Sequence, residues 1–112
     1  MFGFFNFHGT LIQGLGITEK QLVKFLEKKG LRRIDDRDKT DNFSYESNKY
    51  LVYYNSLERS IQLMHRDNQN NKLIEFAKVY FRTNGVAELE TEDNRHLNQF
   101  VIWLKSPEEC EK

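Results

Sequence analysis

Helix boundary signals on both sides of residues 19–29 constrain the fold more than any other feature of this chain. Thr18 is a suitable N-cap, and Gln21 three residues later completes a capping box. Gly30 stands where a helix commonly ends in a left-handed residue. Between these signals the apolar residues recur at helical spacing, at Leu22, Val23, Phe25 and Leu26. The sequence therefore predicts a helix over about residues 19–29.

Much of the remaining chain alternates apolar and polar residues with a period of two, which is typical of strands. The aromatic residues 2–7 are expected to form a hairpin with residues 10–13. Further strands are expected over residues 31–34, 43–46, 50–54, 60–66, 74–82 and 86–91. Polar turns separate them, and Asn84-Gly85 is the strongest hairpin signal among these turns. The strands should form an antiparallel meander.

A second helix is predicted near the C-terminus, over about residues 94–105. Asp93 can cap it, and Ser106-Pro107 can end it. Its apolar stripe consists of Leu97, Phe100, Val101 and Leu104. The short apolar run 100–104 is also compatible with a buried strand. We favour the helix.

The composition fits a single domain. With 112 residues, of which 38% are hydrophobic, the chain is long enough for one core and too short for two. The predicted elements give the fold class α+β, with an antiparallel sheet of about five or six strands and two helices. We expect residues 1–106 to form this domain and residues 107–112 to form an acidic tail.

No segment has the pattern of a targeting or membrane sequence. The apolar run at the N-terminus is short and lacks a preceding positive charge. No run approaches the roughly 20 apolar residues that a membrane span needs. The single cysteine, Cys110, cannot form an internal disulfide. We therefore expect a cytoplasmic protein without a membrane partner.

The charges balance in total but not along the chain. Lysine and arginine number 17, as do aspartate and glutamate, so the formal net charge is zero. This balance argues against a general polyanion binder, which needs a large field of one sign. Residues 1–40 nevertheless carry eight basic and five acidic side chains, whereas residues 81–112 carry four and seven. A local basic contact is therefore compatible with overall neutrality.

The sequence lacks a motif for metal binding or catalysis. His8, His65 and His96 fall in three separate predicted elements, so we do not expect them to converge. No serine occupies a nucleophile elbow, and no glycine-rich loop has the residues of a phosphate site. Glu88 and Glu90 share a strand face, where paired carboxylates are usually solvated. The sequence favours a protein without catalytic residues, metal or cofactor.

The predicted first helix carries the better candidate for a binding site. Its basic residues and those that follow it are Lys20, Lys24, Lys28, Lys29, Arg32 and Arg33. The first three recur every four residues and so line one side of the helix. A solvated helix face, with lysines at the C-terminus where the helix dipole favours cations, is the more common explanation. The functional interpretation is a partner rich in carboxylates or phosphates.

The last hairpin offers a second candidate surface. If Asn84-Gly85 is a two-residue turn, Phe81 lies opposite Glu88. Val79 and Phe81 then form a partly exposed apolar strip, and such strips can mark a partner surface. The alternative is a longer loop that alters the register, or cover by the N-terminal hairpin, and it is the more common outcome.

These observations predict a small non-enzymatic protein that binds another macromolecule, as an inhibitor, an immunity-type protein, an adaptor or an assembly subunit. The expected partner is a protein of unknown identity. The candidate contact residues are Lys20, Lys24, Lys28, Lys29, Arg32, Arg33, Val79 and Phe81. Nucleic-acid binding by residues 20–33 is the alternative, and a small hydrolase or nuclease is a distant third. An uncovered edge strand would allow a homodimer.

Overall fold

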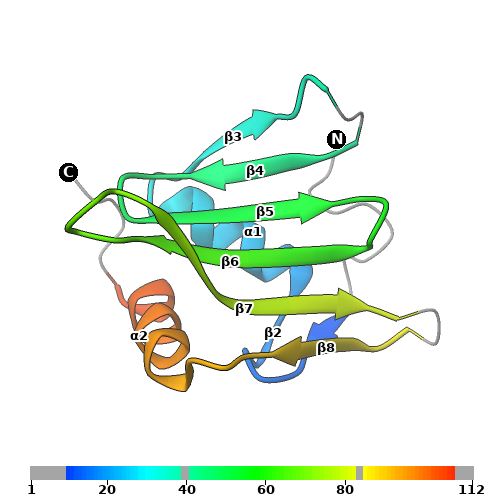
Figure 1. Ribbon diagram of the computed structural model, residues 1–112. Coiled ribbons are helices and arrows are strands. Elements are labelled where there is room, and N and C mark those ends of the chain that lie inside the picture. The colour runs from blue at the N-terminus through cyan, green and yellow to red at the C-terminus, as the bar shows by residue number, and fades with distance from the viewer. Residues whose placement is uncertain (1–9, 39–40, 83–84, 108–112) are drawn as a thin grey trace.

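The computed structural model describes residues 10–38, 41–82 and 85–107, which form two helices and an eight-stranded curled sheet (Figure 1). The helices are α1 (Glu19–Lys28) and α2 (Asn94–Lys105). The strands are β1 (Leu11–Ile12), β2 (Ile17–Thr18), β3 (Arg32–Asp35), β4 (Phe43–Glu46), β5 (Tyr50–Asn55), β6 (Ser60–Arg66), β7 (Leu73–Phe81) and β8 (Ala87–Glu90). Their order in the sheet is β2-β1-β8-β7-β6-β5-β4-β3. The predicted α+β class is confirmed.

Helix α1 begins and ends where its sequence indicates. The Thr18 hydroxyl accepts a hydrogen bond from the Gln21 backbone N–H at 3.2 Å, and the Gln21 side chain accepts one from the Thr18 N–H at 2.9 Å. At the other end, Gly30 has a φ of +89°. There the Leu31 N–H donates to the Leu26 carbonyl at 3.1 Å. These bonds satisfy backbone groups that a helix end leaves without partners.

The sheet differs from the predicted antiparallel sheet of five or six strands. It has eight strands, and β1 pairs in parallel with β8 through Ile12 and Ala87. The turn between β1 and β2 contains Gly14, whose φ is +96° and which lies close against Leu89 of β8. β1 and β2 have two residues each, which is too short for an alternating pattern. The predicted arm over residues 2–7 lies outside the described residues.

Strands β3 to β8 form the expected antiparallel meander, but the last hairpin has another register. Phe81 pairs with Ala87, one residue away from the register of a two-residue turn. The loop is longer, because the Arg82 N–H donates to the Val86 carbonyl at 2.8 Å. A one-residue change of register exchanges the two faces of a strand. Val79 and Phe81 are therefore 0% and 4% exposed, and the prediction that they form an exposed strip is wrong.

Helix α2 forms where it was predicted, so the apolar run 100–104 is helical and not a strand. Asp93 accepts a hydrogen bond at the helix N-terminus, as its sequence position indicates. On the buried side, the centroid of the Phe100 ring lies 5.1 Å from that of Tyr50 in β5. The ring of Trp103 lies 4.6 Å from Tyr50. Aromatic contacts thus attach α2 to the sheet.

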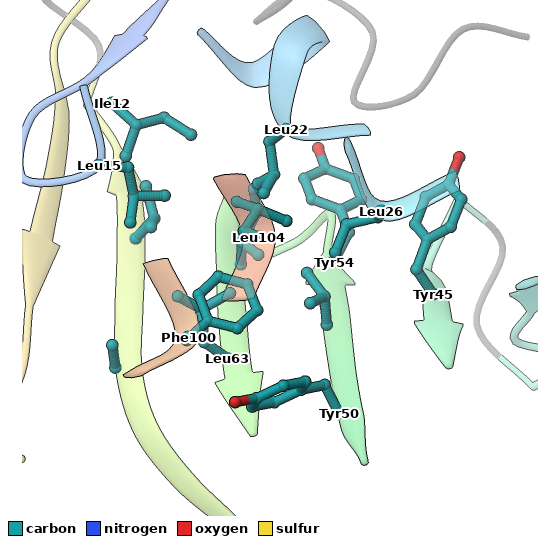
Figure 2. Packing of buried hydrophobic residues seen from close by; sticks show 14 of the residues in the cluster. Ile12, Leu15, Leu22, Leu26, Tyr45, Tyr50, Tyr54, Leu63, Phe100 and Leu104 are labelled. Atoms are coloured by element: carbon teal, nitrogen blue, oxygen red, sulfur yellow. The ribbon is translucent and has the colours of Figure 1, made fainter. Parts of the chain in front are cut away.

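A single buried cluster joins the sheet to both helices (Figure 2). Leu22 and Leu26 come from α1, Phe100 and Leu104 come from α2, and all four are 0% exposed beside Leu63 of β6. The core occupies this face of the sheet, so alternate strand residues lie on the opposite face, which we call the outer face. No helix in the described part of the chain has the length and apolar character needed to cross a membrane.

The register predicts unequal costs for two neighbouring substitutions in β7. Phe81→Ala removes a side chain that is 4% exposed, so the free energy of unfolding should fall by about 3 to 5 kcal/mol. Tyr80→Ala removes a side chain on the outer face and should cost less than half as much. Urea unfolding followed by circular dichroism measures both. A larger loss for Tyr80→Ala would contradict the observed register.

Candidate binding surface

The lysines of α1 lie on its exposed side. Leu22 and Leu26 turn the apolar side of the helix toward the sheet. Lys20, Lys24 and Lys28 are exposed and follow one another at intervals of four residues, so they are neighbours on the helix surface. At 1.5 Å of rise per residue, the three span about 12 Å along the helix axis. We call these three residues the lysine ridge.

The charges of the lysine ridge are not neutralised within the described part of the chain, where none of its lysines has an ion pair. Other cations are paired: Lys78, for example, lies 2.7 Å from Glu58. Of the two glutamates in α1, Glu19 is 0% exposed and so does not share the surface of the ridge. Glu27 is exposed. The ridge therefore keeps an excess of positive charge toward solvent.

Lys29 has a different environment from the ridge. It is 3% exposed, and its ammonium donates to the Ser106 carbonyl at 3.2 Å, just past the end of α2. The same ammonium lies 5.6 Å from the centroid of the Trp103 ring. A cation is favourable at the C-terminus of a helix because of the helix dipole and the free carbonyls. Lys29 thus connects the ends of the two helices.

Arg32 and Arg33 lie on β3, and alternation puts their side chains on opposite faces of the sheet. Arg33 lies over the ring of Phe43 at 3.8 Å and pairs with Asp35 at 3.0 Å. Arg32 is exposed on the outer face, opposite Glu46 in the strand pairing. The six cations that the sequence grouped into one surface therefore occupy three places: the ridge, a buried contact and the edge of the sheet.

Two hollows of opposite character lie elsewhere on the surface. The first has a volume of about 480 Å³ where β7, β8 and the start of α2 meet, and its charged residues are Glu75, Glu90, Glu92, Asp93 and Lys78. The second has a volume of about 460 Å³ where α1 leads into β3, and its charged residues are Lys29, Arg32, Arg66 and Glu46. Although the formal net charge of the chain is zero, its surface thus has one hollow with an excess of carboxylates and another with an excess of cations.

A histidine pair that the sequence does not indicate lies at the start of α2. The rings of His65 and His96 are stacked, with centroids 4.1 Å apart and planes 9° from parallel. His96 Nδ1 also lies 2.7 Å from Asp93 Oδ2. The expectation that the histidines stay apart is therefore wrong for these two, while His8 lies outside the described residues. The i, i+3 spacing of Asp93 and His96 was a usable signal, but the contact with His65 arises from tertiary packing.

The local geometry gives this cluster the properties of a helix cap. The backbone N–H of His96, and then its side chain, hold the pKa of Asp93 below its ordinary value of 3.8. The ionised carboxylate satisfies an N–H group at the start of α2, where negative charge is favourable. Among the residues that the structure describes, no group of three or more histidine, cysteine, aspartate or glutamate side chains could hold a metal ion.

Lys29→Met tests whether Lys29 stabilises the fold. The variant keeps an apolar stem but removes the ammonium, so the free energy of unfolding should fall by about 1 to 2 kcal/mol because Ser106 loses its donor. Lys28→Met, at the neighbouring exposed position, is the matched control and should change stability by less than about 0.5 kcal/mol. Equal losses in urea unfolding would show that Lys29 has no special structural role.

Asp93→Asn tests the charged cap. The pKa of Asp93 is lower in the folded protein than its ordinary value of 3.8, so the ionised carboxylate stabilises the fold. This stabilisation is fully present above pH 3.8 and is lost as the pH falls through the pKa of Asp93 in the folded protein. Asparagine is also a good N-cap but carries no charge. Wild type should therefore exceed the variant in stability at neutral pH, and the difference should vanish in acid. A difference that is independent of pH would contradict the charged cap.

Comparisons of the chain with protein-family models, with curated proteins and with solved structures find no match. On the surface of the chain itself, the lysine ridge is a row of three exposed cations on one helix that have no ion pair among the described residues.

Proposed function

We propose that this chain is a small non-catalytic binding protein that docks its lysine ridge on an acidic surface of a partner protein. The observation that carries the proposal is the contrast between two sets of cations. Lys78, Arg66 and Arg82 each lie beside a glutamate. Lys20, Lys24 and Lys28 are exposed without such a carboxylate in the described part of the chain. A partner would supply the carboxylates that the fold does not.

The proposed contact is short and depends on local charge. Three lysines over about 12 Å match a patch of carboxylates on a folded protein. Exposed ion pairs contribute little each, about 0.2 to 1 kcal/mol, so neighbouring contacts must supply the rest of the affinity. The role would be that of an inhibitor, an immunity-type protein, an adaptor or an assembly subunit, all of which act by occupying a surface of another protein.

The charge balance favours a protein partner over a nucleic acid. A nucleic acid presents a long series of phosphates, and binding to it usually draws on an extended basic field. Here the net charge is zero, Glu27 is exposed on the ridge helix, and carboxylates line the hollow beside β7 and β8. The electrostatic field of the whole molecule would not attract a polyanion. A small acidic patch on a partner protein would contact the three lysines of the ridge alone, so the neutral net charge would not prevent its binding.

Charge reversal of the ridge tests this proposal. Wild type should capture a partner protein from nuclease-treated lysate of its source cells, and the variant Lys20→Glu, Lys24→Glu, Lys28→Glu should fail to capture it. With purified proteins, the variant should bind this partner about a hundredfold more weakly than wild type does. The matched control is Arg37→Glu, Lys72→Glu, Arg95→Glu, which changes the net charge equally at other exposed positions. The control should retain the partner, and the complex should weaken as salt increases.

Two outcomes would overturn the proposal. Equal capture by wild type and the ridge variant would remove the lysine ridge from the interface. The second outcome is capture that disappears after nuclease treatment, together with binding of oligonucleotides that requires the lysine ridge. The logarithm of the oligonucleotide binding constant would then fall with the logarithm of the salt concentration at a slope of about −3, and the ridge would be assigned to a nucleic acid.

A further inference from the structure

Among the residues that the structure describes, strand β3 (Arg32–Asp35) is the last strand at one end of the sheet, with no strand on its outer side (Figure 1). It pairs with β4 on one side, and all four of its residues are exposed. Ile34 is 45% exposed, which is high for a large apolar residue in a strand. An exposed edge presents backbone N–H and C=O groups that another strand can pair with. β3 is therefore a candidate site for strand addition.

The hydrogen bonds to β4 show which backbone groups of this edge point outward. Asp36 donates its N–H to the Asn42 carbonyl at 2.9 Å, so Asp36 faces β4. Because hydrogen-bonded residues alternate in an antiparallel pair, Ile34 also faces β4. Arg33 and Asp35 then direct their N–H and C=O groups away from the sheet. An added strand must form its hydrogen bonds with these two residues.

This alternation restricts how two copies of β3 can pair about a twofold axis. Each outward-facing residue must lie opposite another outward-facing residue, which leaves three registers. Pairing Arg33 with Arg33 or Asp35 with Asp35 places like charges together, which is unfavourable. The third register pairs Arg33 with Asp35 of the second copy. It also places Ile34 opposite Ile34, and Arg32 opposite Asp36.

We propose that two copies of this chain associate through antiparallel pairing of β3 in this third register. The sequence Arg-Arg-Ile-Asp-Asp over residues 32–36 is self-complementary in charge about its central isoleucine. Four backbone hydrogen bonds form between Arg33 and Asp35 of the two copies, and the exposed Ile34 side chains pack together on the outer face. The two sheets become one continuous sheet.

The contact between Arg33 and Asp35 within one copy agrees with this arrangement. Arg33 already pairs with Asp35 of its own strand at 3.0 Å, so in the dimer two arginines and two aspartates form one alternating cluster. Arg32 has no ion pair within the described part of the chain, and the second copy brings Asp36 opposite it. The Asp36 carboxylate already accepts hydrogen bonds from the Tyr53 hydroxyl at 3.0 Å and from the Asp38 N–H at 2.9 Å, so its contribution to the dimer is its charge. Charged residues commonly protect an edge from pairing. In β3 the positive charges precede Ile34 and the negative charges follow it, so opposite charges meet in one antiparallel register.

The experiment uses sedimentation analysis of the full chain over a range of concentrations. The mass of wild type should rise from 13.4 kDa toward twice that value. Arg33→Asp alone places aspartates opposite each other, and Asp35→Arg alone places arginines opposite each other. Each variant should associate at least about tenfold more weakly than wild type. An equimolar mixture of the two restores opposite charges in both pairs and should recover association as a heterodimer.

The mixture separates a charge effect from a folding defect, because two misfolded variants would not complement each other. The double variant Arg33→Asp, Asp35→Arg keeps complementary charges and should associate like wild type. The proposal is overturned if wild type remains monomeric at its highest attainable concentration, if the single variants associate as strongly as wild type, or if the mixture fails to recover association. The Lys20, Lys24, Lys28 variant should dimerise normally, so this proposal and that of the lysine ridge can fail separately.

Discussion

The rotation of α1 about its own axis is the constraint on which the surface of this protein depends. Burial of Leu22 and Leu26 fixes that rotation, since each buried leucine contributes about 1.5 to 3 kcal/mol while an exposed lysine contributes little. A slip of one residue that put Val23 and Glu27 in the places of these leucines would turn the helix by about 100° and move a carboxylate toward the core. The core therefore decides which side of the helix faces solvent, and the lysine ridge occupies that side.

The sequence predicts those features whose causes lie close together in the chain. The capping box of Thr18 and the glycine after α1 act within a few residues, and the structure contains both. The same is true of Asp93 at the start of α2. Period-two alternation gave β4 and β6 with their observed bounds. The direction of the lysine ridge belongs to this class as well, because it follows from helical spacing.

The features that escaped prediction depend on residues far apart in the chain. The parallel pairing of Ile12 with Ala87 leaves no local pattern. The turn signal at residues 84–85 is compatible with a two-residue turn and with the longer loop that the structure contains, and the register that buries Phe81 depends on packing against distant residues. The sequence predicts that Lys29 extends the basic surface beyond the helix, but the end of α2 packs beside it and its ammonium donates to the Ser106 carbonyl. Its role could not be known without that tertiary contact.

The two proposed surfaces lie on one short segment of chain, since α1 ends just before β3 begins. Pairing through β3 would bring two lysine ridges into one assembly. For a partner with repeated acidic patches, the second contact would then form at a high effective concentration, so two weak contacts would give strong binding. By mass action, a partner that engages both ridges would in turn stabilise the dimer. Neutral total charge is compatible with this arrangement, because the attraction would come from two local patches.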